Sequence, residues 1–532
     1  MPPTASVCVL DGEASIGGTK ILVDTGSHRV LLDFGTNYKR MGAFYEEYLH
    51  PRPSRGMTDL LAVGLLPRRR GFYRPDLFPP TEFPRGDEGF PGEPPDGVLL
   101  THAHLDHCGA LAYLDPRLPV YASPATVATL RAVQETGKTD LSSEIVYVAE
   151  RTAVDERRLA SARGAGRLRR PFRLLGDLPD PLAALLAEPP SKRAAFEGPA
   201  PGPAAGDPLV RAIGLDAPPV DHSLLGSTAF LLDVDGARIA YTGDVRFHGG
   251  RGRETEAFVR RLEERAPDVL LVEGTRLARP GEGPAGPTTT EDDVRRNAEE
   301  VVRSHAGRLV VADFGPRNIE RLITFRAIAQ ETGRSLVVTG KDAHLLRLLA
   351  AVDPRVPTQF GPGAMRIWEE PTTARPPTWL ERVVAAVPDA LVGPAEIERA
   401  PGRWIVCFSF FDANDLVDLK SAARGGVWLY SSSEAHGEEQ EIDFRRLENW
   451  IAWAEMHCVG FHCDGPDGAI RYDPGFHASG HATEAELLDL VRRSRARLVV
   501  PVHTEAPGRY EAVLGPEGVR VASPRPGVPI PL

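Results

Sequence analysis

The chain has 532 residues, a net charge of −11 and 42% hydrophobic residues, a composition typical of a globular protein with roughly two to four domains. The acidic balance argues against a protein that coats nucleic acid through bulk positive charge. No apolar run is long enough to span a membrane, and the N-terminus lacks a secretion signal, so we expect neither membrane insertion nor secretion. Five scattered cysteines disfavour a disulfide framework and indicate a reducing, cytoplasmic environment.

Short strands and turns are predicted along the first part of the chain. The first three strands are expected at Val7–Leu10, Lys20–Asp24 and Arg29–Asp33. Pro, Gly and Arg interrupt residues 51–95, which we expect to be an irregular surface excursion. Two further strands and a helix are predicted at Gly97–Thr101, Leu118–Tyr121 and Ser123–Glu135. Residues 155–219 carry few large apolar side chains, and we interpret them as an insertion that is partly helical and partly loop.

Strands and helices alternate in the second half of the chain. Asp235-Gly236 predicts a hairpin between Ser227–Val234 and Arg238–Thr242. After a Pro/Gly linker at Arg279–Pro287, Thr290-x-x-Asp293 resembles a helix capping box. Strands are then expected at Arg308–Ala312, Ser335–Thr339, Trp404–Phe408, Val427–Tyr430 and, in the last segment, Arg497–Val502. Helices are expected between them at Asn318–Glu331, Ala343–Ala351 and Phe444–Glu455. This alternation predicts a doubly wound parallel sheet.

The strongest chemical signal is Thr101-His102-Ala-His104-Leu-Asp106-His107, directly after the strand Val98–Leu100. In a turn that leaves a strand, His102 and His104 point the same way, while Asp106 and His107 turn toward an adjacent position. Imidazole and carboxylate groups suit zinc, and a mixed nitrogen and oxygen set also accommodates manganese. The spacing therefore predicts a metal site.

This motif is the signature of the metallo-β-lactamase superfamily, which the chain resembles. The remaining ligands of that superfamily lie at later strand ends, where this chain carries Asp221-His222-Ser223, Thr242-Gly243-Asp244 and Pro501-Val502-His503. The resemblance implies two Zn²⁺ ions per chain, with Mn²⁺ as an alternative. One ion would be held by His102, His104 and His222, and the second by Asp106, His107 and His503, with Asp244 bridging both. Leu32-Asp33-Phe34-Gly35 resembles the early aspartate that orients the ligand loop through hydrogen bonds.

Three further features resemble the β-CASP nucleases within this superfamily. The strand Val269–Val272 runs into Glu273-Gly274-Thr275, which is similar to their Glu-Ser-Thr motif. Gly475-Phe-His477-Ala-Ser479-Gly480-His481 resembles their second motif, and His503 follows His481 at the family interval of 22 residues. Tyr430-Ser431-Ser432-Ser433-Glu434 resembles a serine-rich loop of the ribonuclease J branch.

The resemblance assigns roles to these residues. Asp106 would orient the nucleophile for in-line attack on phosphorus. His481 would protonate the departing 3′-oxygen, with Glu273 holding the tautomer of its ring. A terminal 5′-phosphate would meet donors of the substrate-binding residues Ser431, Ser432, Ser433, His477 and Ser479. By contrast, His457-Cys458 and His462-Cys463 are interpreted as core packing rather than as metal ligands.

The resemblance also implies the fold and the domain organisation. The expected fold class is α/β, a metallo-β-lactamase αββα sandwich with an inserted, doubly wound β-CASP domain. Residues 1–284 would form the first part of the metallo-β-lactamase domain, with insertions near 51–95 and 155–219. Residues 285–464 would form the inserted domain, and residues 465–532 the C-terminal part of the first domain.

The implied activity is that of a metal-dependent phosphodiesterase acting on single-stranded RNA, as a 5′–3′ exonuclease, an endonuclease or both, in RNA processing or decay. A nuclease of the crosslink-repair type, acting on single-stranded DNA, is an alternative, although such relatives tend to carry an apolar residue where this chain has His503. A small-molecule hydrolase would need neither His481 nor Glu273, and a silent scaffold would not need the full ligand set.

The sequence departs from the family pattern at two places. Relatives read His-Gly-Glu where this chain has His503-Thr504-Glu505, and Glu273 replaces an aspartate common in ribonuclease J. The oligomeric state stays open.

Overall fold

The structure is a computed structural model that describes residues 5–46, 48–162, 166–192, 194–279, 288–432, 438–464 and 469–532, without the side chains of residues 438–442. These residues form two compact units. Unit 1 comprises Met1–Phe247, Arg251–Ala285 and His481–Leu532, and unit 2 comprises His248–Gly250 and Gly286–Gly480. The predicted domain boundaries at 284/285 and 464/465 touch residues outside the described part and stay predictions.

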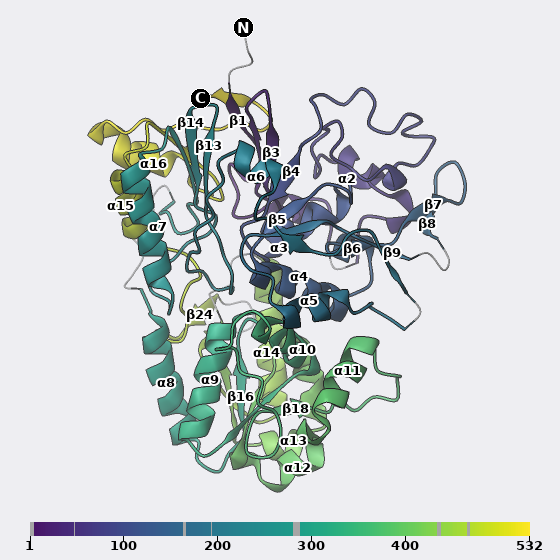
Figure 1. Ribbon diagram of the computed structural model, residues 1–532. Coiled ribbons are helices and arrows are strands. Elements are labelled where there is room, and N and C mark those ends of the chain that lie inside the picture. The colour runs from purple at the N-terminus through teal and green to yellow at the C-terminus, as the bar shows by residue number, and fades with distance from the viewer. Residues whose placement is uncertain are drawn as a thin grey trace. The chain divides into compact units, whose positions relative to one another are not determined.

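Unit 1 is a sandwich of two sheets (Figure 1). The larger sheet has the order β12-β10-β5-β4-β3-β2-β1-β26. Its strands are β1 (Ser6–Asp11), β2 (Lys20–Asp24), β3 (Arg29–Phe34), β4 (Gly97–Leu99), β5 (Val120–Ala122), β10 (Phe172–Leu174), β12 (Gly202–Pro203) and β26 (Pro529–Pro531). The smaller sheet has the order β13-β14-β15-β25, with β13 (Phe230–Val234), β14 (Ala237–Tyr241), β15 (Val269–Val272) and β25 (Leu498–Pro501).

The core of unit 1 lies between these sheets and under the helices that cover them. Val9 and Leu32 of the larger sheet pack in one buried cluster with Phe230, Leu271 and Val500 of the smaller sheet. On the other face of the smaller sheet, a second cluster joins its strands to α7 (Gly252–Arg265), α15 (Glu484–Ser494) and α16 (Gly508–Leu514). Helix α4 (Pro124–Thr136) contacts β10 of the larger sheet. The predicted sandwich is therefore present.

Several local predictions in unit 1 are confirmed. Strand β2 has the predicted bounds, β1 extends one residue further at each end, and β3 extends one residue further at its carboxyl end. The hairpin β13–β14 turns at Asp235 and Gly236, with φ values of 51° and 83° that fit a two-residue turn matching the strand twist. Helix α4 matches the predicted helix Ser123–Glu135 closely, and Ser123 is its N-cap, whose side chain accepts a hydrogen bond from the Thr126 N–H.

The interpretation of residues 51–95 as a surface excursion is wrong in part. Helix α2 (Thr58–Ala62) buries Leu60 and Leu61, and Phe72 and Leu77 are also buried in this segment. The chain is irregular there, yet its apolar side chains fill space between the turns that Pro and Gly produce. Composition alone suggested an exposed loop because the large apolar residues are spaced without a helical or strand period.

The interpretation of residues 155–219 as an insertion is also wrong in part. Strand β10 pairs in parallel with β5 and β12, so this stretch completes one edge of the larger sheet. Two more of its strands, β9 (Arg167–Arg169) and β11 (Phe196–Glu197), form a small sheet with β6 (Tyr147–Val148). Strands of two or three residues carry too few positions to show an alternating pattern.

Unit 2 contains a parallel sheet of order β19-β18-β17-β20-β16-β21-β22. Its strands are β16 (Val310–Asp313), β17 (Ser335–Val338), β18 (Arg366–Trp368), β19 (Leu391–Val392), β20 (Trp404–Cys407), β21 (Val427–Tyr430) and β22 (His457–Val459). Its longer helices are α8 (Glu291–Ser304), α9 (Ile319–Glu331), α10 (Gly340–Ala350), α11 (Thr378–Ala386) and α14 (Glu438–Trp453). The predicted capping box is confirmed, because Thr290 and Asp293 exchange hydrogen bonds at the start of α8.

Helices cover both faces of the sheet in unit 2. Val311 and Trp428 lie in one buried cluster with Leu447 and Ile451 of α14. Val310, the neighbour of Val311 on β16, is buried outside that cluster, while α9 contacts β17 and β20 and α10 contacts β18. Since successive side chains of a strand point to opposite faces, this arrangement is the predicted doubly wound sheet.

Two further findings concern the pairing of the cysteines and the character of the helices. All five cysteines are free. Among the described residues, no helix combines the length and the apolar character that crossing a bilayer requires.

A buried charge cluster in residues 51–95 yields a test of this packing. The fully buried guanidinium of Arg74 donates to Asp76 (2.7 Å) and Glu144 (2.8 Å). Because Arg74→Met leaves Asp76 without its cation and Glu144 with Arg151 alone, we expect it to lower the free energy of unfolding by about 3–5 kcal/mol. Urea unfolding followed by circular dichroism measures the loss.

Arg117→Met is the matched control, since Arg117 pairs with Asp115 at the exposed surface. Its cost should stay below about 1 kcal/mol. Equal losses in the two variants would show that residues 51–95 contribute no buried charge pair to the fold.

Candidate metal centre

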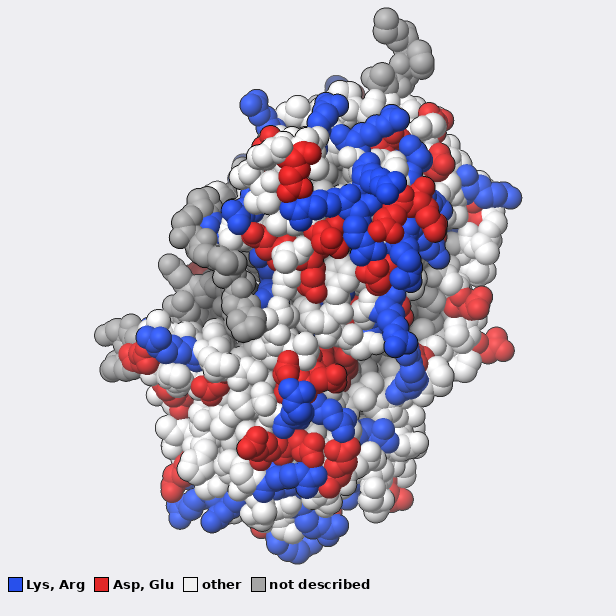
Figure 2. Space-filling view, turned by 90° about the vertical axis from the view of Figure 1, so that its left-hand side faces the viewer, with Lys and Arg blue, Asp and Glu red and all other residues white. Residues whose placement is uncertain are grey.

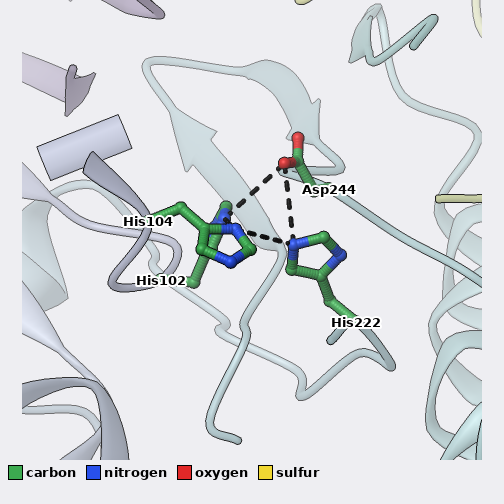
Figure 3. Close-up of side chains that lie close together, drawn as sticks. All are labelled: His102, His104, His222 and Asp244. Atoms are coloured by element: carbon green, nitrogen blue, oxygen red, sulfur yellow. Dashed lines mark hydrogen bonds and ion pairs between the residues drawn. The ribbon is translucent and has the colours of Figure 1, made fainter. Parts of the chain in front are cut away.

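Three histidines and one aspartate form a first group of converging side chains in unit 1 (Figure 3). Nδ1 of His104 lies 3.1 Å from Nε2 of His102 and 3.0 Å from Nε2 of His222. Oδ2 of Asp244 lies 3.6 Å from Nε2 of His102 and 3.8 Å from Nε2 of His222. The four residues come from the turn after β4, the loop before β13 and the end of β14.

A second group shares Asp244 with the first and adds three other predicted residues. Asp106 and His107 lie on the short helix α3 (Leu105–Cys108), and His503 follows β25. Nε2 of His107 lies 3.1 Å from Oδ2 of Asp244, and Nε2 of His503 lies 3.0 Å from Oδ2 of Asp106. The structure thus brings all seven predicted metal ligands into two groups that meet at one carboxylate.

The direction of the strands explains why residues so distant in sequence meet. Strands β14, β15 and β25 are parallel neighbours, so their carboxyl ends lie at one edge of the smaller sheet. Asp244, Glu273 and His503 follow those three ends. Gly243 adopts a φ of 55° and packs so closely against Thr101 that a β-carbon there would lie 2.8 Å from the threonine methyl group. This contact joins the strand ends of the two sheets.

Asp33 organises the turn that carries His102 and His107. Its buried carboxylate accepts hydrogen bonds from the Thr101 N–H, the Thr101 hydroxyl and the Tyr241 hydroxyl, each at 2.8 Å. Nδ1 of His107 lies 2.8 Å from the same carboxylate, which leaves Nε2 to face Asp244. Oγ1 of Thr101 also lies 2.9 Å from Nδ1 of His102. These contacts are what an orienting role for Asp33 requires.

Burial and opposite charges perturb the ionisation of these groups strongly. Burial opposes ionisation of Asp244, but the neighbouring histidines, His107 foremost, outweigh it and hold the pKa of Asp244 well below its usual value. Burial likewise opposes protonation of His107, but Asp244 and Asp106 raise its pKa well above the usual value. For His102, burial and the adjacent His107 together lower the pKa well below the usual value. The Asp244 carboxylate is thus held charged, the form that binds metals.

Two buried polar atoms in this cluster indicate that it accommodates a ligand. Among the described residues, Nε2 of His107 and Oδ1 of Asp244 are buried and have no hydrogen-bond partner. Leaving such atoms unsatisfied is costly unless a ligand meets them. The donor set of imidazole nitrogens and carboxylate oxygens fits a metal ion such as zinc. Both groups are therefore compatible with metal binding.

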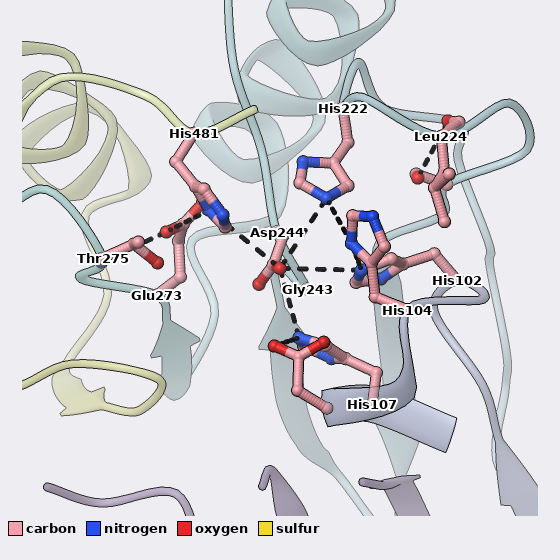
Figure 4. A network of polar contacts seen from close by, with 12 residues as sticks. His102, His104, His107, His222, Leu224, Gly243, Asp244, Glu273, Thr275 and His481 are labelled. Atoms are coloured by element: carbon pink, nitrogen blue, oxygen red, sulfur yellow. Dashed lines mark hydrogen bonds and ion pairs between the residues drawn. The ribbon is translucent and has the colours of Figure 1, made fainter. Parts of the chain in front are cut away.

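A third group joins Asp244 to Glu273 and His481 (Figure 4). Nδ1 of His481 lies 3.0 Å from Oε2 of Glu273 and 4.0 Å from Oδ2 of Asp244. The Glu273 carboxylate is fixed in turn by the backbone N–H groups of Val245 and Thr275. Burial disfavours the charged ring, but Glu273 and then Asp244 outweigh it and raise the pKa of His481 to about 9. His481 therefore stays protonated at neutral pH, and its side chain remains 19% exposed.

The predicted phosphate contacts lie in unit 2, where the side chains of Ser431 and His477 are engaged by the protein itself. Ser431 is buried, and its hydroxyl accepts from Arg321 (2.6 Å) and donates to the carbonyl of Phe476 (3.0 Å). The two ring nitrogens of His477 face the carbonyls of Ser432 (2.8 Å) and Gly460 (2.6 Å). These contacts tie the serine-rich loop to the segment before His481.

The remaining residues of that predicted set are less informative. The carbonyl of Ser479 lies 3.0 Å from Nε2 of His248. Ser433 lies outside the described residues. A substrate contact by any member of the set stays a prediction.

The loop between β1 and β2, which the sequence analysis did not single out, supports two of the predicted ligands. The backbone N–H groups of Gly18 and Thr19 donate to the carbonyl of Asp106, and the carbonyl of Gly12 accepts from the N–H of His503. A β-carbon on Gly17 would lie 2.6 Å from the β-carbon of Asp106. The Gly17-Gly18 pair was a visible turn signal, but nothing local indicated what it would contact.

A buried ion pair was also missed. Nε of Arg246 lies 3.1 Å from Oδ1 of Asp221, and both side chains are fully buried. Asp221 precedes His222, and Arg246 follows Asp244 by two residues. The pair therefore links the two loops that bring these groups together, and a charge pair between distant loops leaves no trace in the sequence.

Charges on the surface of unit 1 around α7 and α15 are mixed (Figure 2). Arg493 of α15 pairs with Glu256 and Glu263 of α7, and Arg261 of α7 pairs with Asp216. Basic and acidic side chains are interspersed on this face, so it presents no extended basic surface to a phosphate backbone.

Comparison with known families adds two matches. Residues 76–312 match the metallo-beta-lactamase superfamily. Residues 475–508 match the Zn-dependent metallo-hydrolase RNA specificity domain, a segment that contains both His481 and His503.

Individual relatives agree with these matches. A ribonuclease J of Sinorhizobium meliloti is 22% identical over 416 residues, which is 77% of this chain and 57% of that protein. A ribonuclease J of Mycobacterium tuberculosis is 26% identical over 299 residues, covering 53% of this chain and 45% of its own length. The chain thus spans about half of the length of these curated relatives.

A solved structure supports the fold along the whole chain. The crystal structure of a protein of unknown function from Enterococcus faecalis V583 superposes with a TM-score of 0.66 at 20% identity, covering 99% of this chain and 100% of that one. The predicted metallo-β-lactamase fold is confirmed. The chain carries a metallo-beta-lactamase domain and a segment that matches the RNA specificity domain, and it is similar to ribonuclease J proteins.

Proposed function

We propose that the protein is a metal-dependent nuclease that hydrolyses single-stranded RNA in the cytoplasm, as a 5′–3′ exonuclease, an endonuclease or both. The observation that carries the proposal is the His481–Glu273 pair beside Asp244, the carboxylate shared by two groups of candidate metal ligands. The match to an RNA specificity domain and the similarity to ribonuclease J proteins support RNA as the substrate. Five free cysteines support a reducing compartment.

Two Zn²⁺ ions are the proposed cofactors, with Mn²⁺ as an alternative. His102, His104 and His222 would hold one ion, Asp106, His107 and His503 the other, and Asp244 would contact both. When bound, such ions stabilise negative charge on phosphoryl oxygens and make water more acidic. Asp33 would keep His107 in the tautomer that presents Nε2 to its ion.

The chain's own acid–base chemistry would centre on His481. Its Nδ1 is engaged by Glu273, and Nε2 would donate a proton to the departing 3′-oxygen. A pKa of about 9 keeps that proton in place at neutral pH. Asp106 would orient the attacking nucleophile on the opposite side of phosphorus.

Recognition of a 5′-phosphate would fall to fewer residues than the resemblance implies. The Ser431 hydroxyl and the His477 ring already hold the serine-rich loop. Ser432 and Ser479, which are partly exposed, are the better candidates for a phosphate contact.

Product analysis tests the function directly. Purified protein with added Zn²⁺ or Mn²⁺ is incubated with single-stranded RNA and DNA of one sequence, each labelled at the 5′ or the 3′ end, and with the RNA duplex. The expected result is cleavage of single-stranded RNA only, with 5′-labelled mononucleotides indicating exonuclease action and internal fragments indicating endonuclease action. Cleavage of DNA alone would favour the repair-type alternative, and cleavage of neither would leave a small-molecule hydrolase.

Substitution of His481 separates acid catalysis from metal binding. We expect His481→Ala to retain metal and RNA affinity while single-turnover cleavage falls by about 10²–10⁴-fold, because only the proton donor is lost. Glu273→Gln should reduce the rate less, and it should move the alkaline limb of the pH–rate profile to lower pH, because removing the carboxylate lowers the pKa of His481.

His462→Ala provides the control, since His462 is an exposed histidine of unit 2. By contrast, His503→Ala should lose metal and turnover together. If His481→Ala cleaves at the wild-type rate, His481 is not the proton donor, and a simpler hydrolase that relies on its metals alone becomes the better reading.

Metal content provides a separate prediction. Purified protein should contain close to two metal ions per chain, from the two groups of ligand atoms. His104→Ala should lose at least one of them. Asp33→Asn should keep the ions but bind them about 10–100-fold more weakly, because it disturbs only the groups that orient the ligands. Elemental analysis and competition with a chelator measure the two effects.

Asp233→Asn, on an exposed position of β13, is the control for Asp33→Asn. An active protein that contains no transition metal would refute the metal assignment altogether.

A further inference from the structure

An exposed aromatic segment lies next to the candidate metal centre in unit 1. It begins with the helix α1 (Tyr38–Gly42) and continues through the loop that follows. Tyr38 is 53% exposed, Phe44 51%, Tyr48 83% and Leu49 56%. Large apolar side chains left in water at this density within 12 residues typically mark a binding surface.

The segment is attached to the backbone that carries the candidate ligands. Just before it, the N–H of Thr36 donates to the carbonyl of Leu105 at 2.9 Å, and Gly35 packs directly against the carbonyl of Asp106. Within it, Nζ of Lys39 lies 2.7 Å from Oε1 of Glu505, two residues after His503. These contacts place the start of the segment beside the backbone that carries Asp106 and His503.

Charge indicates which kind of ligand fits. Lys39 and Arg40 stand between Tyr38 and Phe44, and the Lys39 side chain is 61% exposed despite its contact with Glu505. The two acids of the segment, Glu46 and Glu47, stand in the sequence between Phe44 and Tyr48. Exposed aromatic rings with cations beside Tyr38 suit a flexible chain that carries flat bases and phosphates. A protein partner would instead favour a contiguous apolar patch with few charges at its centre.

We propose that Tyr38, Phe44 and Tyr48 form a stacking platform for the bases of single-stranded RNA next to the scissile phosphate. The inference rests on the proposed function, and it adds the part of the substrate that is held and the residues that hold it. Stacking on Tyr38, Phe44 and Tyr48 would be tolerant of sequence, since every base has a flat face. It would also favour single strands, whose bases are free to unstack from one another.

Removal of one ring and its conservative replacement test the platform. Tyr48→Ala should raise Kd and KM for a single-stranded RNA of about 12 nucleotides by roughly 5–100-fold, which is the effect of losing one stacked base. The kcat should change little, and Tyr48→Phe should restore the affinity because the ring is retained. Phe411→Ala is the matched control, as Phe411 is an equally exposed aromatic residue of unit 2.

A second pair of measurements separates the platform from the nuclease assignment. Hydrolysis of bis(4-nitrophenyl) phosphate, which carries no base, reports on the metal centre alone, so the loss in Tyr48→Ala should be confined to RNA. RNA that contains 5-iodouridine should crosslink under ultraviolet light to Tyr38, Phe44 or Tyr48, as identified by mass spectrometry.

Three results would overturn the platform. The first is unchanged RNA affinity in both Tyr48→Ala and a Tyr38→Ala/Tyr48→Ala double variant. The second is an equal loss with RNA and with the small ester, which would indicate a structural role. The third is altered self-association with unchanged RNA affinity, which would assign the segment to a second copy of the chain. If the wild-type protein neither binds nor cleaves RNA, the proposed function itself is wrong, and the platform, which rests on it, is wrong with it.

Discussion

One buried carboxylate, Asp244, is the constraint on which the rest of the site depends. Two groups of histidines and the His481–Glu273 pair all converge on it. An isolated charge at that depth would be costly, so it persists because His107 and other partners hold it in the ionised form. Every loop that contributes a partner must therefore end close to this carboxylate.

The fold meets this constraint by aligning strand ends. Parallel pairing of β14, β15 and β25 places the residues that follow each strand at the same edge, and the parallel β3–β4 pair does the same for Asp33 and Thr101 in the other sheet. Two of the residues involved adopt left-handed backbone conformations, Asp33 with a φ of 55° and His503 with a φ of 51°. Such conformations cost about 1–3 kcal/mol each, and they persist because the surrounding hydrogen bonds fix them.

Support for the ligands is spread over elements that bind no metal themselves. The β1–β2 loop forms backbone hydrogen bonds with Asp106 and His503, and the Arg246–Asp221 pair connects the loops of Asp244 and His222. Substitutions in these supports would reach the metal centre without touching it. The same geometry positions the start of α1, since it follows Gly35, which packs against the carbonyl of Asp106.

The sequence by itself determined the chemistry and most of the local structure. The spacing of His102, His104, Asp106 and His107 indicated a metal site, and the capping box at Thr290 and the hairpin turn at Asp235 were readable because their partners lie within a few residues. Likewise, the alternation of strands and helices indicated the doubly wound sheet of unit 2.

Only the tertiary structure decided which distant groups meet. His503 and Asp106 are 397 positions apart, and the burial of Arg74, the pairing of β10 and the engagement of Ser431 depend on partners that no local pattern names. The physical reason is that periodicity and capping report interactions within one element. Contacts between elements are set instead by strand direction, register and packing, which exist only once the chain has folded.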